Sequence, residues 1–222
     1  MPTIELLSAK AHGHLRLLPT SAKPTHFVQI LVTEFSAAAV CCPILFTKDG
    51  STGAFYAGAM FGFKPGENLL GTAAERGGFE PLLPRREGFF LSERSIAIDR
   101  ECARFGVHDG EPLFNDAGEP SASLRAIQRT LGEIHAGVEQ TNPFIAAMVG
   151  LKLIEPIDVS LNFGSERVSL QGLYTVSLDR LRELDDAAVL KLFREGHLQP
   201  AYGMSASLKH IGRLAALRQK QQ

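Results

Sequence analysis

The sequence predicts a single α+β domain, in which a mostly antiparallel N-terminal β half packs with a C-terminal half of helices around a second β-hairpin. Apolar residues alternate with period two in several segments before residue 116, and after residue 120 they recur every three or four positions. The alternation returns between residues 157 and 174. Separate runs of strands and helices argue against a doubly wound parallel sheet. We expect residues 1–222 to form one domain with a subdivision near 116–120.

The densest apolar region, residues 37–70, predicts the central hairpin of the sheet. Apolar side chains alternate over residues 40–46 and again over 55–63, with a polar turn around Asp49-Gly50 between them. The intervening positions are also mostly apolar, so we expect both faces of these strands to be covered. Gly58 would weaken a strand unless it permits a bulge or a close approach of another segment.

Shorter segments predict the rest of the β half. The residues up to Lys23 predict a peripheral arm or strand, residues 27–35 a buried strand, and residues 96–99 another short strand. Residues 108–120 are rich in Gly, Pro and carboxylates, but they lack the ligand spacing of an EF-hand. We therefore expect a connecting loop there rather than a calcium site.

The C-terminal half predicts several helices. Residues 124–138 carry one apolar stripe, and Ser121 or Ser123 is the expected N-cap. Asn142-Pro143 predicts the start of a separate, buried helix over residues 144–153. After the second hairpin, Ser177 and one of Asp185 and Asp186 predict two further N-caps, and Gly196 predicts a helix end. A basic helix is expected over residues 208–217.

Composition excludes several classes of protein. The chain is 45% hydrophobic with a formal net charge of −1, whereas a dedicated nucleic-acid-binding protein usually carries a basic excess. The longest nearly apolar run, residues 37–46, is far shorter than the roughly 20 residues of a membrane helix, and no signal-peptide pattern is present. Adjacent cysteines at 41 and 42 on a strand would point to opposite faces and so predict no disulfide framework. We expect a soluble protein in the reducing cytoplasm.

Known catalytic and cofactor motifs are absent from the sequence. It contains no phosphate-binding loop, no dinucleotide fingerprint, no C-x-x-C and no H-E-x-x-H. His12 and His14 could form a ligand pair, but no nearby Cys or carboxylate completes a site, so no metal is predicted. No cofactor is predicted either. A site assembled from distant residues remains open at this stage.

The chain resembles the SapC family of surface-array-locus proteins, which is distinct from the peptide-transporter permease of the same name. The stretches that carry this resemblance follow the family order over nearly the whole chain, and they are PILFTKDGSTGAFYAGAMFGFKPGENLL, PRREGFF, IAID, GEPLFNDAGEP, LKLIEPIDVSL, GLYTVSLDRLREL and GHLQPAYGMSASLKHIGRL. The resemblance implies a role in surface-layer biology or in handling or modifying peptides. It supplies no catalytic residues.

Among the polar positions that resemble the family, some are explained by turns alone and others are not. The less well explained ones are our candidates for a ligand pocket: Lys48, Glu67, Asn68, Arg85 and Arg86. Two hypotheses follow. The favoured one is a non-catalytic binding or accessory protein for a peptide or protein partner, because catalytic motifs are missing. The alternative is an enzyme that acts on a peptide or a small acid through these five residues.

Overall fold

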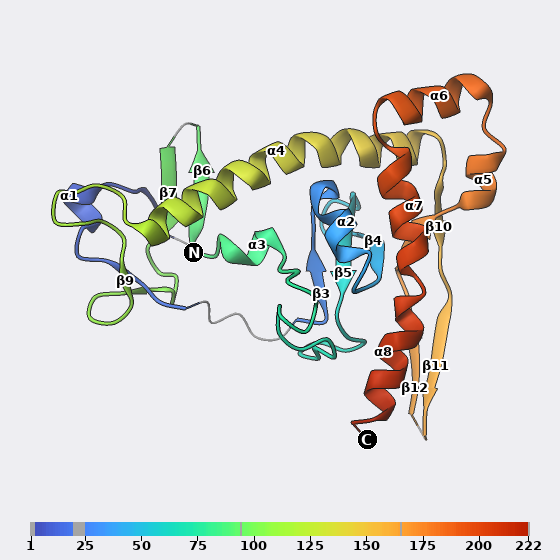
Figure 1. The fold of residues 1–222 in the computed structure, drawn as a ribbon, viewed down its shortest axis with the longest axis horizontal. Helices are drawn as coiled ribbons and strands as arrows, with labels where there is room; N and C mark the ends of the chain where they lie inside the picture. Colours follow the sequence, from blue (N-terminus) through green and yellow to red (C-terminus); the bar gives the residue numbers. More distant parts are fainter. Residues whose placement is uncertain (1–2, 20–24, 94, 165, 222) are drawn as a thin grey trace. The chain divides into compact units, whose positions relative to one another are not determined.

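A computed structural model describes residues 3–19, 25–93, 95–164 and 166–221 and shows an α+β fold with antiparallel sheets, as predicted (Figure 1). Its contacts divide the chain into two compact units. Unit 1 comprises Met1–Lys23 and Leu82–Ala136, and unit 2 comprises Pro24–Pro81 and Gly137–Gln222. The division into a single domain with a boundary near 116–120 stays a prediction. Residues 1–2 and 20–23 of the predicted arm lie outside the described residues.

Unit 1 contains two small antiparallel sheets and its own hydrophobic core. The first sheet has the strand order β1 (Ile4–Leu6), β7 (Ser95–Asp99) and β6 (Phe89–Ser92). The second has the order β8 (Phe105–Gly106), β2 (Arg16–Leu17) and β9 (Glu111–Pro112). Short helices α1 (Ala9–His12) and α3 (Leu82–Arg85) complete the unit, with the first part of α4 (Ala122–Gly150). Phe89, Ile98 and Leu113 are fully buried and pack with the apolar stripe of α4 that starts at Leu124.

Unit 2 is organised around a five-stranded antiparallel sheet. In sheet order its strands are β10 (Ile154–Pro156), β13 (Tyr174–Val176), β4 (Ile44–Lys48), β5 (Phe55–Met60) and β3 (Phe27–Gln29). A separate ribbon consists of β11 (Val159–Phe163) and β12 (Glu166–Leu170). The helices are η1 (Val32–Glu34), α2 (Phe35–Ala38), α5 (Leu178–Arg182), α6 (Asp186–Arg194), α7 (Leu198–Ser207) and α8 (His210–Gln219), with the second part of α4.

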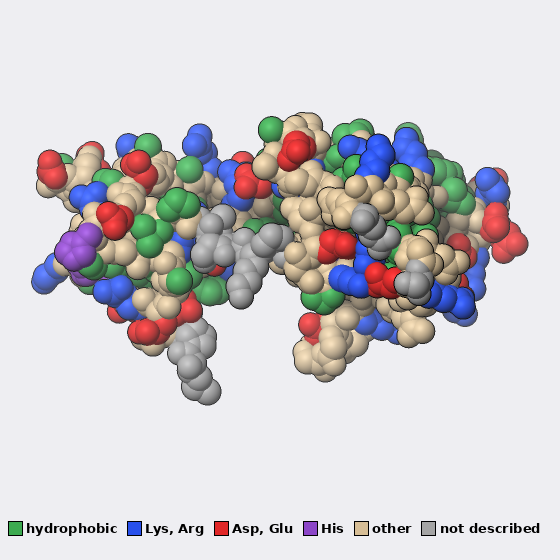
Figure 2. All heavy atoms as spheres, turned by 90° about the horizontal axis from the view of Figure 1, so that it is seen from below, with side chains coloured by type: hydrophobic (Ala, Val, Ile, Leu, Met, Phe, Trp, Pro, Cys, Tyr) green, Lys and Arg blue, Asp and Glu red, His purple; other side chains and the backbone are tan. Residues whose placement is uncertain are grey.

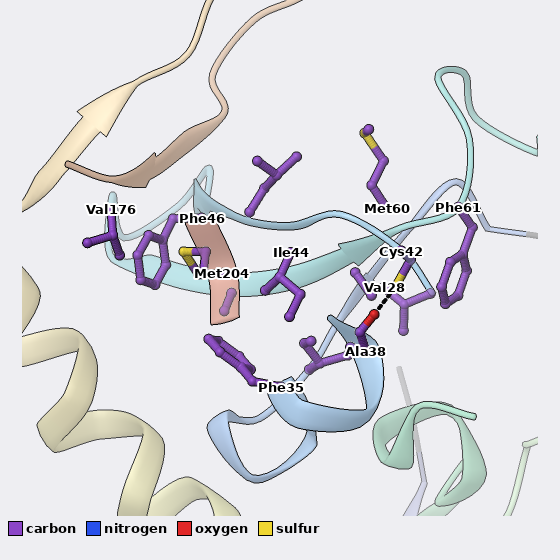
Figure 3. Packing of buried hydrophobic residues seen from close by; sticks show 14 of the residues in the cluster. Val28, Phe35, Ala38, Cys42, Ile44, Phe46, Met60, Phe61, Val176 and Met204 are labelled. Atoms are coloured by element: carbon purple, nitrogen blue, oxygen red, sulfur yellow. Dashed lines mark hydrogen bonds between the residues drawn. The ribbon is translucent and has the colours of Figure 1, made fainter. Parts of the chain in front are cut away.

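The core of unit 2 lies between this sheet and the helices. Ile44 and Phe46 alternate onto one face of β4 and meet Phe35 of α2 and Met204 of α7 (Figure 3). Phe144 of α4 joins them, with its ring centroid 5.8 Å from that of Phe35 and 6.1 Å from that of Phe46. The hydroxyl of Ser207 accepts a hydrogen bond from the Ile44 N–H at 2.8 Å, which attaches α7 to the first residue of β4.

The central hairpin is confirmed but is shorter than predicted. β4 and β5 pair in register from Ile44–Ala59 to Lys48–Phe55, on either side of the predicted turn. Residues 40–42 are not part of the strand, because they form the turn that follows α2. Gly58 fulfils the expected close approach, because a Cβ there would lie 2.1 Å from an atom of the Phe27 ring on β3.

Two predictions of secondary structure were wrong. Residues 27–35 do not form one strand: only Phe27–Gln29 is extended, and η1 and α2 follow. A short apolar run has no period that separates a strand from a buried helix. The break at Asn142-Pro143 is also absent, since α4 continues through Pro143. Phe144 and Met148, which follow Pro143, are fully buried, and their packing offsets the loss of one helical hydrogen bond.

Other helix signals were correct. Ser121 accepts from the Leu124 N–H, Ser177 caps α5, and the Asp185 carboxylate accepts from the Ala188 N–H at 2.7 Å at the start of α6. Gly196 has φ +75° just after α6, the left-handed conformation expected at a helix C-terminus. The second hairpin is also confirmed as β11–β12, although residues 174–176 join the main sheet instead. Residue 165 at its turn lies outside the described residues. Helix α7 was not predicted.

Candidate functional site

Lys48 lies at the end of β4 beside two aromatic rings. Its Nζ is 4.9 Å from the ring centroid of Phe55 and 5.5 Å from that of Tyr174, and both contacts are cation–π interactions. The following turn is held by Asp49, whose Oδ1 accepts hydrogen bonds from the backbone and hydroxyl groups of Ser51 and Thr52. These hydrogen bonds, led by that of the Ser51 hydroxyl, hold the pKa of Asp49 below its usual range.

Glu67 and Asn68 order the segment that follows β5. A Glu67 carboxylate oxygen accepts from the Phe63 N–H at 2.5 Å, and its other oxygen lies 3.4 Å from Nε of Arg218. The Asn68 side chain accepts from the Leu70 N–H and donates to the Gly71 carbonyl at 2.9 Å. Each of these two side chains therefore has a local structural role.

Arg85 and Arg86 belong to unit 1, at the end of α3 and just after it. Arg86 donates to the Phe89 carbonyl at 3.2 Å, and its guanidinium lies 5.3 Å from the ring centroid of Phe90. The Arg85 carbonyl accepts from Arg104 at 2.7 Å. Lys48, Glu67 and Asn68 belong to unit 2. The five candidates are thus distributed over both units, and a shared ligand pocket stays a prediction.

Arg218 of α8 forms a charged cluster that the sequence analysis missed. Its side chain is only 8% exposed, and its Nη2 donates to the Glu166 carboxylate at 3.0 Å. Its guanidinium also lies 4.6 Å from the ring centroid of Phe163. Lys64 contacts the Glu166 carboxylate as well, and this hydrogen bond, followed by the charge of Arg218, lowers the pKa of Glu166. The cluster joins α8 to the β11–β12 ribbon that runs beside it (Figure 1).

A groove in unit 2 lies between α4, α6 and the start of α7. Its volume is about 830 Å³, and none of the five candidate residues lines it. We call it the helical groove. Much of its surface comes from small or apolar residues. Among them are Ala146, Ala147 and Gly150 of α4, Ala188 and Leu192 of α6, and Pro200 of α7.

Polar groups border the helical groove and pair with each other. Nε2 of His197 lies 3.6 Å from the Glu195 carboxylate, and Nζ of Lys191 lies 3.9 Å from the same carboxylate. The His197 ring packs edge-on against Phe144, with the centroids 5.8 Å apart. Gln140 adds an amide to the rim. The arrangement suits binding of an apolar group within a polar border.

The sequence held only a weak signal for the helical groove. The apolar helix over residues 144–153 was expected to be buried on all sides, but Val149 is 47% exposed and Gly150 opens on the groove. Small residues one turn apart on α4 could have indicated a close approach of another segment. Their partners on α6 and α7 lie about forty to fifty residues further on, so only the fold brings them together.

Neither the distribution of charged side chains in Figure 2 nor the arrangement of metal-binding groups in the described residues indicates another binding site. Acidic and basic side chains are interspersed over the face that Figure 2 shows. Over the ranges that the structure describes, no group of three or more His, Cys, Asp or Glu side chains is arranged to hold a metal ion. His12 donates through Nε2 to Glu5, 3.1 Å away, while its Nδ1 accepts from the Ser8 N–H. The carboxylate-rich loop is closed by Asn115, which accepts from the Ala117 and Glu119 N–H groups.

Comparison with known protein families gives one match. The sequence profile of the SapC family matches residues 7–214 of the 222 residues. The chain belongs to the SapC family. No curated protein and no solved structure matches it. Within the described part of this SapC-family chain, no helix is long and apolar enough to cross a membrane.

Proposed function

We propose that this SapC-family chain is a non-catalytic binding or accessory protein that takes a short peptide segment of a partner into the helical groove. The proposal includes a cytoplasmic location and a role in surface-layer biology or in the handling or modification of peptides. The groove carries the proposal, because a cavity of about 830 Å³ falls within the range of roughly 300–1,000 Å³ that is typical of ligand sites.

The groove suits a peptide that presents one or two bulky apolar side chains. Ala147, Gly150 and Ala188 leave room for a leucine or aromatic side chain, which would exchange exposed apolar surface for contact with Leu192. Gln140 and the Lys191–Glu195 pair at the rim provide donors and acceptors for the peptide's own amide groups. An apolar floor within a polar border matches a peptide better than a purely hydrocarbon ligand.

The remaining features favour binding over catalysis. Glu67, Asn68 and Arg86 each make contacts that shape their own turns. The Lys48 ammonium lies against the rings of Phe55 and Tyr174. The three cysteines are free, which is consistent with a reducing compartment.

A matched pair of glycine substitutions on α4 tests the proposal. Gly150→Leu fills the helical groove, whereas Gly132→Leu changes a glycine of the same helix outside it, and a Cβ at either position meets no atom within 4 Å. The probes are capped pentapeptides that differ only in a central Leu, Phe or Ser, titrated by NMR with amide shifts as the readout. We expect Leu and Phe peptides to shift Ala147 and Ala188 more strongly than the Ser peptide does.

Gly150→Leu should weaken this binding by about tenfold or more, because the new side chain occupies the volume that the ligand needs. Gly132→Leu should leave it unchanged. The proposal fails if no peptide binds, or if both variants bind equally well. Mass spectrometry of the recovered peptide distinguishes the enzymatic alternative, since a binding protein returns it unaltered.

A further inference from the structure

Cys41 and Cys42 lie side by side in the turn between α2 and β4, not on opposite faces of a strand. Both sulfur atoms approach the same acceptor, and each Sγ is 3.4 Å from the carbonyl oxygen of Ala38 (Figure 3 draws the Cys42 contact). The expectation from the sequence was wrong because the chain reaches strand geometry only at Ile44. The turn thus places two thiols together at one point.

The surroundings favour a thiolate at Cys41. The neighbouring Cys42 side chain is the largest influence on the Cys41 thiol, and it lowers the pKa of Cys41. Burial acts in the opposite direction, while the positive charges of Arg76 and Arg213 lower it further. The neighbouring Cys41 side chain, together with burial, raises the pKa of Cys42, so that Cys42 keeps its proton. Cys41 is therefore the nucleophile of the pair, and Cys42 is the thiol that reacts second.

The pair lies close to the surface of unit 2. Cys41 is 6% exposed, and the preceding residue, Val40, is 74% exposed. A small oxidant therefore needs to pass only the edge of this turn. Cys102, in unit 1, has no neighbouring cysteine in the sequence and serves as an internal reference.

We propose that Cys41 and Cys42 form an oxidation site, in which a hydroperoxide converts the two thiols into a disulfide between adjacent residues. The Cys41 thiolate attacks a peroxide oxygen, the O–O bond breaks, and the departing oxygen takes up a proton to give water or an alcohol. Cys41 is then a sulfenic acid. The Cys42 sulfur attacks it, an S–S bond forms, and the hydroxyl group leaves as water with the Cys42 proton. The two thiols are oxidised and the hydroperoxide is reduced.

The disulfide has to be strained and easily reduced. Adjacent α-carbons are about 3.8 Å apart, closer than the roughly 4.4–6.8 Å of ordinary disulfides. Closing the ring has to turn the peptide between the two cysteines, which breaks the hydrogen bonds of their N–H groups to Ala38. The contact of Arg213 with the Cys41 carbonyl, at 3.4 Å, is disturbed as well. Strained disulfides are the labile, regulatory class, so the site can switch in both directions.

The test is to treat the full chain with a small excess of hydrogen peroxide, unfold it in denaturant so that the buried thiols can react, block the remaining thiols with N-ethylmaleimide and measure intact and peptide masses. We expect the number of labelled cysteines to fall from three to one, with the label on Cys102 and a mass loss of two hydrogen atoms in the peptide that contains both partners. Reduced glutathione should restore all three labels.

The variants separate this site from general oxidation. Cys102→Ser should keep the loss of two labels, whereas Cys41→Ser and Cys42→Ser should each abolish the mass loss. If either of these variants fails to fold, peptide mapping of the unsubstituted chain still decides the question. The proposal is overturned if all three thiols remain, if Cys41 carries a sulfinic acid without a disulfide, or if the bond joins two chains.

Discussion

Arg218 joins three segments of unit 2 that are distant in the sequence. It contacts Glu67 after β5, Glu166 at the start of β12, and the Phe163 ring at the end of β11. Sequence analysis identified the basic character of the last helix but not the burial of this guanidinium, because its carboxylate partners lie far away in the chain. Glu67 was singled out from the sequence as a ligand residue, and the structure gives it this ion-pair contact.

Removing the guanidinium should destabilise unit 2. We expect Arg218→Met to lower the free energy of unfolding by about 2–3 kcal/mol, because it leaves the Glu67 carboxylate without its counter-ion and removes one of the two cations beside Glu166. Chemical denaturation measures the change. Arg182→Met, which breaks an exposed pair with Asp179, is the control and should change the free energy by less than about 1 kcal/mol. Equal effects of the two variants would contradict the structural role of Arg218.

His210 at the start of α8 should make stability depend on pH. Burial, the largest contribution, lowers the pKa of His210, and Lys209 and Arg213 act in the same direction against the hydrogen bond to the Ala39 carbonyl. The unfolded chain therefore takes up this proton at a higher pH than the folded chain does. The contribution of His210 is fully present above about pH 6.5 and is lost as the pH falls toward the folded pKa.

A comparison with His210→Gln isolates this proton, since glutamine keeps a donor but does not titrate. The stability advantage of the unsubstituted chain over the variant should shrink as the pH falls from about 7.5 to about 5. Urea denaturation across this range provides the measurement. An advantage that stays constant or grows toward acid would show that His210 does not titrate in this way.

At the level of elements, the helix boundaries illustrate what sequence can and cannot reveal. The caps at Ser177, Asp185 and Gly196 were predictable, because each depends on one residue type at one local position. Pro143 was misread, because its effect is set by the packing of Phe144 against rings on α2 and β4. The helical groove was not predictable, since its walls come from separate helices.

The cap of α6 provides a test at this scale. Asp185→Ala should destabilise the helix by about 1 kcal/mol, because it removes the acceptor for the Ala188 N–H. Asp186→Ala removes only a first-turn charge and should cost less than about 0.5 kcal/mol. Hydrogen exchange at the amides of α6 measures both. A larger effect of the Asp186 substitution would show that Asp185 is not the N-cap of α6.

At the level of the whole molecule, each unit has a separate hydrophobic core. Phe89 is fully buried in unit 1, and Phe144 is fully buried in unit 2. The α+β class followed from the periodicity of the sequence. The discontinuous units did not, because apolar patterning shows which residues are buried but not which core they enter.

Paired core substitutions should separate the two units. We expect Phe89→Ala to speed hydrogen exchange chiefly in β6 and β7, and Phe144→Ala chiefly in β4 and β13, each with a loss of about 3–5 kcal/mol. Phe193→Ala is the matched control, because Phe193 is 68% exposed on α6 and should cost less than about 0.5 kcal/mol. Equal acceleration throughout the chain for both core variants would indicate one cooperative core.

The order in which the units are completed has a consequence for synthesis. Unit 1 has all its residues once Ala136 has been made, whereas β4 of unit 2 waits for its neighbour β13, which ends at Val176. At ribosomal rates, making the chain from Met60 to Val176 takes on the order of 5–25 s. Throughout that interval the β4–β5 hairpin lacks one of its two neighbouring strands and the helix α7 that packs on β4. We therefore expect a nascent chain of this sequence to bind chaperones that recognise extended apolar segments at the ribosome.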